Sequence, residues 1–101
     1  MVFGNKLREL RESQNLVLRK VAAELDIDTA TMSKIERGDR HAKREHLPIL
    51  SKIFGISEEE LKTLWLAEKV CEIIAEEDEG LDALKVAEAH IEYSLVNSKA
   101  I

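Results

Sequence analysis

The amino-acid sequence predicts an all-α protein, and two observations support this class. Apolar residues recur at the three- and four-residue spacing of amphipathic helices, whereas β-branched residues never alternate with polar ones over a strand's length. The 4 glycines and 1 proline are too few for a succession of β-hairpins. With 101 residues, 45% of them hydrophobic, the chain is expected to fold as one small domain or one domain with an appendage.

The first half of the chain is predicted to form four short helices. Each combines apolar residues at helical spacing with charged residues on the opposite side. The expected helices cover approximately residues 3–13, 19–25, 29–37 and 44–54.

The breaks between these helices carry residues suited to turns and caps. Asp26 is expected in the left-handed conformation, which Asp tolerates better than most residues. Asp28 is expected to cap the third helix through its carboxylate, and Gly38 to end it. Pro48 falls early in the fourth helix, where a missing amide matters least, and Gly55 ends that helix.

Two longer helices are predicted in the second half. Ser57, followed by Glu60 three residues later, forms a capping-box pattern at the start of a helix over residues 58–78. A last helix is expected over residues 81–96, with a frayed tail at residues 97–101.

Charge is divided unevenly along the chain, although the formal net charge is −5. Residues 1–54 contain 11 Lys and Arg against 8 Asp and Glu, a net of +3. Residues 55–101 contain 4 against 12, a net of −8. The first half can therefore approach a polyanion while the acidic half points away.

Several classes of function find no support in the residue pattern. A single cysteine, Cys71, gives neither a disulfide nor a zinc pattern, and the three histidines lack metal-ligand spacing. No nucleophile–base pair or phosphate loop is recognisable, so we expect no enzyme, no metal and no cofactor. Without a signal peptide or a membrane-spanning apolar run, a soluble cytoplasmic protein is expected.

The segment "DTATMSKIERGD" at residues 28–39 has the pattern of a helix that enters a DNA groove. On a helical wheel, Met32 and Ile35 mark its buried side, and Glu36 lies toward that flank. The expected base contacts are Thr29, Ala30, Ser33 and Lys34. The expected phosphate contacts are Arg19, Arg37, Arg40, Lys43 and Arg44.

Four motifs in register resemble the helix-turn-helix domain of the Xre, Cro and phage-repressor family, over about residues 3–60. They are "KLRELR", Ala22 with Leu25, "SKIERG" and "FGIS". The resemblance implies a five-helix repressor-like helix-turn-helix fold with a C-terminal helical extension. The DNA-binding domain is expected at residues 1–56 and the extension at residues 57–101. It also implies an ion pair between Arg11 and Glu36.

Three residues depart from the family pattern. Leu18 stands where Gln is common, Asp26 where the turn usually holds Gly, and Thr29 where Gln often pairs with adenine. The DNA sequence that this chain reads is therefore expected to differ from the sites of well-known members.

The tail segments "LWLAEKVCEII" and "LDALKVAEAHIEY" are similar to small controller regulators that accompany restriction–modification methylase genes. The sequence therefore predicts a DNA-binding transcriptional regulator, acting as a homodimer on a palindromic operator of double-stranded DNA and controlling its own gene. The alternative is an antitoxin-like protein-interaction module with a DNA-binding domain.

The helix expected at residues 58–78 carries apolar residues on more than one face, which indicates burial on two sides. We expect a dimer interface there, and the tryptophan of this set also fits a core position better than a small-molecule pocket. The expected interface residues are Leu64, Trp65, Val70, Ile73 and Ile74.

Overall fold

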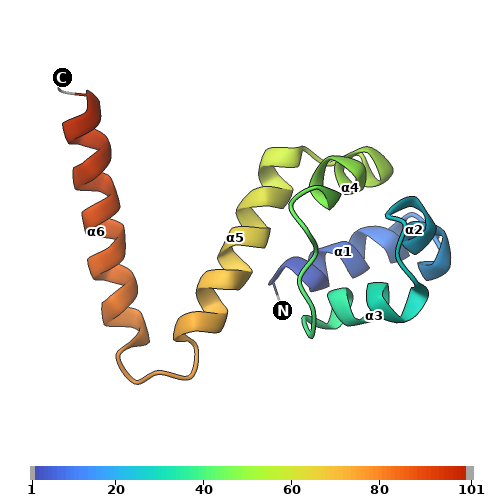
Figure 1. Cartoon of the computed structure of the whole chain (residues 1–101), viewed down its shortest axis with the longest axis horizontal. Helices are drawn as coiled ribbons and strands as arrows, with labels where there is room; N and C mark the ends of the chain where they lie inside the picture. Colours follow the sequence, from blue (N-terminus) through green and yellow to red (C-terminus); the bar gives the residue numbers. More distant parts are fainter. Residues whose placement is uncertain (1, 100–101) are drawn as a thin grey trace. The chain divides into compact units, whose positions relative to one another are not determined.

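A computed structural model describes the backbone of residues 2–99 and the side chains through residue 97, and it confirms the all-α class (Figure 1). Within residues 2–99, all regular secondary structure is helical. The helices are α1 (Val2–Ser13), α2 (Leu18–Glu24), α3 (Thr29–Arg37), α4 (His46–Phe54), α5 (Glu58–Ile74) and α6 (Gly80–Lys99).

The chain divides into two compact units, Met1–Glu68 and Lys69–Ile101. The first unit extends beyond the domain expected at residues 1–56, because Leu61, Trp65 and Glu68 of α5 are buried, with exposed fractions of 0%, 5% and 2%. The Glu68 carboxylate accepts hydrogen bonds from the backbone amides of Phe3 and Gly4 at 3.2 and 3.4 Å. It therefore satisfies amides at the beginning of α1 that have no partner within that helix.

The predicted turns and caps around α3 are confirmed. Asp26 has a φ of 57°, in the left-handed region. Gly38 and Gly55, which end α3 and α4, have φ values of 82° and 67°. The Asp28 Oδ1 atom accepts from the amide of Thr31 at 2.6 Å, so the carboxylate caps α3 as expected.

The predicted start of α4 at Arg44 was wrong, because α4 begins at His46. Pro48 has no amide hydrogen, so it cannot donate the i→i−4 bond that would place Arg44 inside the helix. The carbonyl of Arg44 accepts instead from the amide of Leu47 at 3.1 Å, and that of Lys43 from the amide of His46 at 2.9 Å. These i→i+3 bonds make a tight turn immediately before the helix.

The predicted bounds of the last two helices also need correction. Ser57 Oγ accepts from the amide of Glu60 at 3.1 Å and caps α5 as expected, but α5 ends at Ile74 instead of residue 78. Residues 76–79 are all acidic, and carboxylates at a helix C-terminus oppose the helix dipole and repel one another.

The last helix is longer than expected at both ends. α6 covers Gly80–Lys99, so residues 97–99 of the tail expected to fray are helical, and residues 100 and 101 lie outside the described residues. Charged residues occur along the whole of α6. No helix in the described part of the chain is long and apolar enough to cross a membrane.

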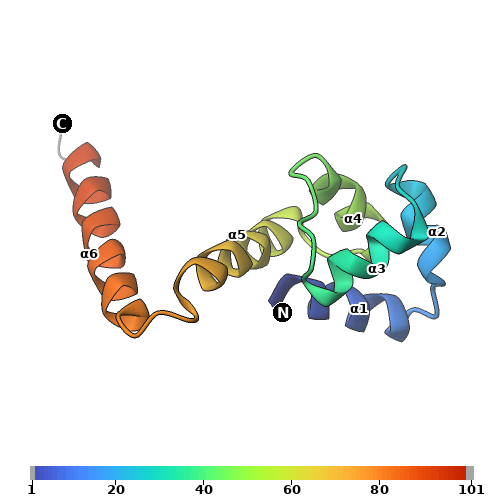
Figure 2. The ribbon, with the colours of Figure 1, turned by 60° about the horizontal axis from the view of Figure 1, so that its bottom comes forward.

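The first unit places α3 beside α1, and both views show this arrangement (Figure 2). The backbones come close at Gly4, where a Cβ atom would lie 2.4 Å from the carbonyl oxygen of Glu36 and 2.6 Å from that of Ile35. Only glycine fits this position without moving α3. The buried apolar core consists of Phe3, Leu7, Val21, Ala22, Leu25, Met32, Ile35, Ala42, Leu47, Leu50, Phe54, Leu61 and Trp65.

The close approach of α1 and α3 predicts that Gly4→Ala destabilises the protein. Replacing Gly by Ala within a helix normally stabilises by roughly 0.5–1 kcal/mol. At Gly4 the new methyl group meets backbone atoms, and such overpacking costs about 1–3 kcal/mol. We therefore expect a net loss in the free energy of unfolding, measured by urea denaturation. The exposed neighbour Asn5 gives the control, Asn5→Ala, which should leave that free energy unchanged or raise it.

Candidate nucleic-acid interface

The outer face of α3 carries the four residues expected to contact bases. Thr29, Ala30 and Lys34 are exposed, and Ser33 is half-buried. The opposite face is fixed in the core, since Met32 and Ile35 are 0% and 2% exposed. α3 therefore presents one polar side outward and cannot roll about its axis without exposing its apolar side.

The carboxylate of Asp28 is committed to the beginning of α3. The pKa of Asp28 lies below its ordinary value, mainly because the backbone amide of Thr31 donates a hydrogen bond to the carboxylate. A hydrogen bond from the Thr31 side chain and the nearby charges of Lys34 and Arg40 lower the pKa further. The positive end of the helix dipole stabilises the negative charge of the ionised Asp28 carboxylate. The same cations place positive charge around this end of α3.

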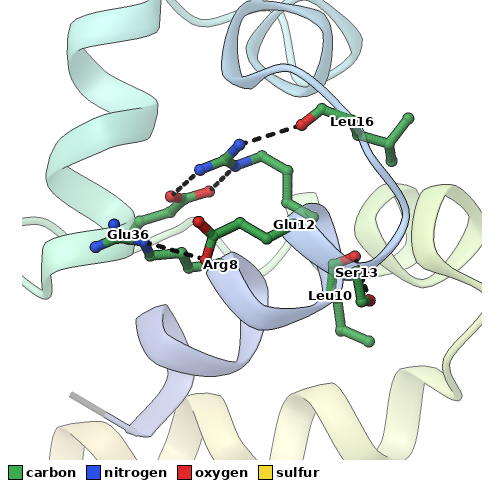
Figure 3. Close-up of polar contacts among 7 residues, drawn as sticks. Arg8, Leu10, Glu12, Ser13, Leu16 and Glu36 are labelled. Atoms are coloured by element: carbon green, nitrogen blue, oxygen red, sulfur yellow. Dashed lines mark hydrogen bonds and ion pairs between the residues drawn. The ribbon is translucent and has the colours of Figure 1, made fainter.

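Arg11 of α1 and Glu36 of α3 form a bidentate ion pair, as the family resemblance implies. Arg11 Nε and Nη2 donate to Glu36 Oε2 and Oε1 at 2.8 and 3.2 Å, and Nη1 donates to the carbonyl of Leu16 at 3.1 Å (Figure 3). The side chains are 17% and 7% exposed. The hydrogen bond to Glu36 is the main reason why the pKa of Arg11 is raised above its usual value. The pair fixes α3 on α1 and turns its internal carboxylate away from the outer face.

The five residues expected to bind phosphates are all exposed, and they fall into two groups. Arg19 lies in the first turn of α2. Arg37 is the last residue of α3, and Arg40, Lys43 and Arg44 lie in the chain that follows α3. Arg37 shares its charge with Asp39, because Arg37 Nε lies 3.2 Å from the Asp39 carboxylate. Residues 39–45 make up most of the connection between α3 and α4, and we call them the cationic segment because they include Arg40, Lys43 and Arg44.

The cationic segment is held to the core by contacts that the sequence analysis did not anticipate. Trp65 Nε1 of α5 donates to the carbonyl of Ala42 at 2.8 Å, and the guanidinium carbon of Arg44 lies 5.2 Å from the centre of the indole ring. His46 Nδ1 accepts from the amide of Lys43 at 3.2 Å. These partners are 3 to 23 residues apart, and nothing in the local sequence around residues 39–45 signals the contact with α5.

The residues expected at a dimer interface differ in their surroundings. Trp65 is 5% exposed within its own unit, so its ring offers little surface to a second chain. Leu64 and Ile74 are half-buried, whereas Val70 and Ile73 are 41% and 75% exposed. Only the last two present substantial apolar area to solvent.

A capped helix with a polar outer face, a preceding helix joined by a short turn, and flanking cations define a DNA-binding helix-turn-helix regulator. The chain belongs to the helix-turn-helix family, as an Xre-type regulator: the family model described as "Helix-turn-helix domain" matches residues 2–64. That range covers α1 to α4 and the first part of α5, and leaves α6 outside.

Curated relatives agree with this assignment. The chain is 34% identical over 62 residues to control protein C.BamHI of Bacillus amyloliquefaciens. The matched stretch covers 60% of this chain and 76% of that relative. It is 40% identical over 60 residues to control protein C.MunI of Mycoplasma sp. This match covers 58% of this chain and 81% of that relative.

A third relative is larger. The HTH-type transcriptional activator BcrR of Enterococcus faecalis is 34% identical over 61 residues, which cover 60% of this chain but 30% of that protein. No solved structure matches the chain.

The buried ion pair predicts a large effect of Glu36→Gln. The substitution leaves Arg11 without its counter-charge, and breaking one partner of a buried pair costs about 3–5 kcal/mol. We expect thermal or urea unfolding to show a loss of about 3 kcal/mol, at the lower end because the amide oxygen still accepts one hydrogen bond. The control is Glu12→Gln, which removes an exposed pair with Arg8 and should change stability by less than about 0.5 kcal/mol. Equal stability of the two variants would contradict this role of the pair.

His46 predicts a pH dependence of stability. Burial lowers the pKa of His46, Lys43 adds to this lowering, and Glu45 opposes it. The unfolded chain therefore takes up a proton before the folded one, so the free energy of unfolding should fall as pH drops below about 6.5. It should level off at pH values above 6.5, where His46 is neutral in both states.

Urea denaturation across about pH 5 to 8 measures this dependence. His46→Gln should flatten the slope below pH 6.5, while the control His90→Gln, at an exposed position on α6, should keep it. An unchanged slope in His46→Gln would assign the dependence to other groups.

Proposed function

We propose that the chain is a homodimeric, sequence-specific transcriptional regulator that binds a palindromic operator in double-stranded DNA. The observation that carries this proposal is the outer face of α3, which presents Thr29, Ala30, Ser33 and Lys34 from a helix locked in the core. The first two side chains are small, so one copy makes few specific base contacts. Two copies, with α3 in successive major grooves about 34–36 Å apart, double the number of bases read.

The C-terminal unit supports self-association. Val70 and Ile73 of α5 and most apolar side chains of α6 are exposed, which is more apolar surface than a single small unit usually leaves in water. The exposed apolar residues of α6 are Leu81, Leu84, Val86, Ile91, Tyr93, Leu95 and Val96. We propose that a second copy covers part of this surface, which assigns dimerisation to the second unit, Lys69–Ile101, within the extension expected at residues 57–101.

The regulatory role follows from the relatives. Two of them are named control proteins. We therefore propose that this chain acts in the cytoplasm as the autoregulatory controller of a restriction–modification system, without a small-molecule ligand.

The direct test is the selection of bound sites from random DNA by the purified protein. Recovery of two inverted half-sites one helical turn apart supports both dimerisation and specificity. Failure to enrich any sequence at low salt would overturn the proposal, while a single asymmetric half-site would remove the dimer. Sedimentation of the free protein adds a check, since a stoichiometric protein partner in place of a homodimer favours the antitoxin-like alternative.

Lys34→Ala is expected to lower affinity for the selected site. A good bidentate contact to guanine discriminates by about 1–3 kcal/mol, so binding should weaken roughly 10- to 100-fold on that site and much less on unrelated DNA. Gel shifts over a salt series measure both. Lys52→Ala removes a charge of the same type from an exposed position on α4 that is not among the expected DNA contacts, and it should leave the affinity within about twofold.

A further inference from the structure

We propose that Trp65 is a positioning residue for DNA binding: it holds the cationic segment so that Arg44 is oriented toward a phosphate before DNA arrives. This inference rests on the proposed DNA-binding function and adds a role for a residue that touches no DNA itself. Trp65, Ala42 and Arg44 all belong to the first compact unit.

The backbone of the segment is fixed at two successive residues. The Ala42 carbonyl accepts from Trp65 Nε1 at 2.8 Å, and Ala42 is 3% exposed, so this hydrogen bond is shielded from water. The next amide, that of Lys43, donates to His46 Nδ1 at 3.2 Å. The segment has no helical hydrogen bonds until its last turn, so these side-chain contacts determine its path.

The side chain of Arg44 is fixed by the same indole ring. Its guanidinium carbon lies 5.2 Å from the ring centre, within the range of a cation–π contact. In such a contact the N–H donors that do not face the ring stay available to bind a phosphate. A side chain already held in one orientation loses less conformational entropy when it binds.

Arg40 supplies an internal comparison. It lies in the same segment and is exposed like Arg44, but it is not part of the ring contact. If Trp65 acts by orienting Arg44, the two arginines must respond differently to a change at residue 65. A general loosening of the fold would affect both equally.

A double-mutant cycle on DNA affinity separates these possibilities. Trp65→Leu removes both the aromatic face and the N–H donor, and it is expected to weaken binding about two- to tenfold. In the Arg44→Ala background the same substitution should have a clearly smaller effect, whereas in the Arg40→Ala background it should keep its full effect. Equal effects in both backgrounds would overturn the proposal.

Fluorescence tests the contact without DNA, because Trp65 is the only tryptophan in the chain. In the free protein, Arg44→Ala should change the emission of Trp65 and Arg40→Ala should not. An unchanged emission in Arg44→Ala would overturn the proposal. This readout needs no variant at residue 65, so it still decides if Trp65→Leu fails to fold. If the unaltered protein binds no selected DNA, the proposed function fails, while the fluorescence result still reports on how Arg44 is held.

Discussion

The docking of α3 on α1 is the constraint on which the rest of the molecule depends. The Arg11–Glu36 pair and the approach at Gly4 fix α3 at two points along α1, one by charge and one by the absence of a side chain. A carboxylate on a DNA-reading helix would repel phosphates if it faced outward. Buried against a guanidinium, Glu36 becomes an anchor, and the outer face of α3 keeps only neutral and cationic side chains.

The same arrangement explains how an acidic chain can present a helix to DNA. The net charge of −5 is not the charge that a phosphate meets at α3, since charges beyond about 8–10 Å are largely screened at physiological ionic strength. Two of the acids close to α3 have structural partners: Asp28 caps the helix and Asp39 pairs with Arg37. What remains around the outer face is dominated by the cations of α3 and the cationic segment.

Local chemistry was predictable from the sequence, and distant contacts were not. The Asp28 cap, the left-handed Asp26 and the ends at Gly38 and Gly55 depend on residues within one turn, so the sequence identified them. The start of α4 and the end of α5 differ from the prediction, because the missing amide of Pro48 and the acidic residues 76–79 limit these helices more than the apolar spacing indicates. Trp65 was assigned to an interface because a wide apolar stripe does not show which of its members pack within the same unit. The hydrogen bond from Trp65 to Ala42, 23 residues away, leaves no signal in the local sequence. The Arg11–Glu36 ion pair joins residues 25 apart, and it was predicted from the family resemblance.

The small size of Thr29 and Ala30 has a consequence for how specificity must arise in the proposed complex. Short side chains contact bases only if the helix lies deep and in one register, since a small displacement removes them from the groove floor while Lys34 can still follow. Phosphate contacts set that register without reading sequence. The precision of base reading by α3 therefore depends on how rigidly the cations beyond its end are held. In the proposed complex, this links the buried Trp65 of α5 to base reading by α3.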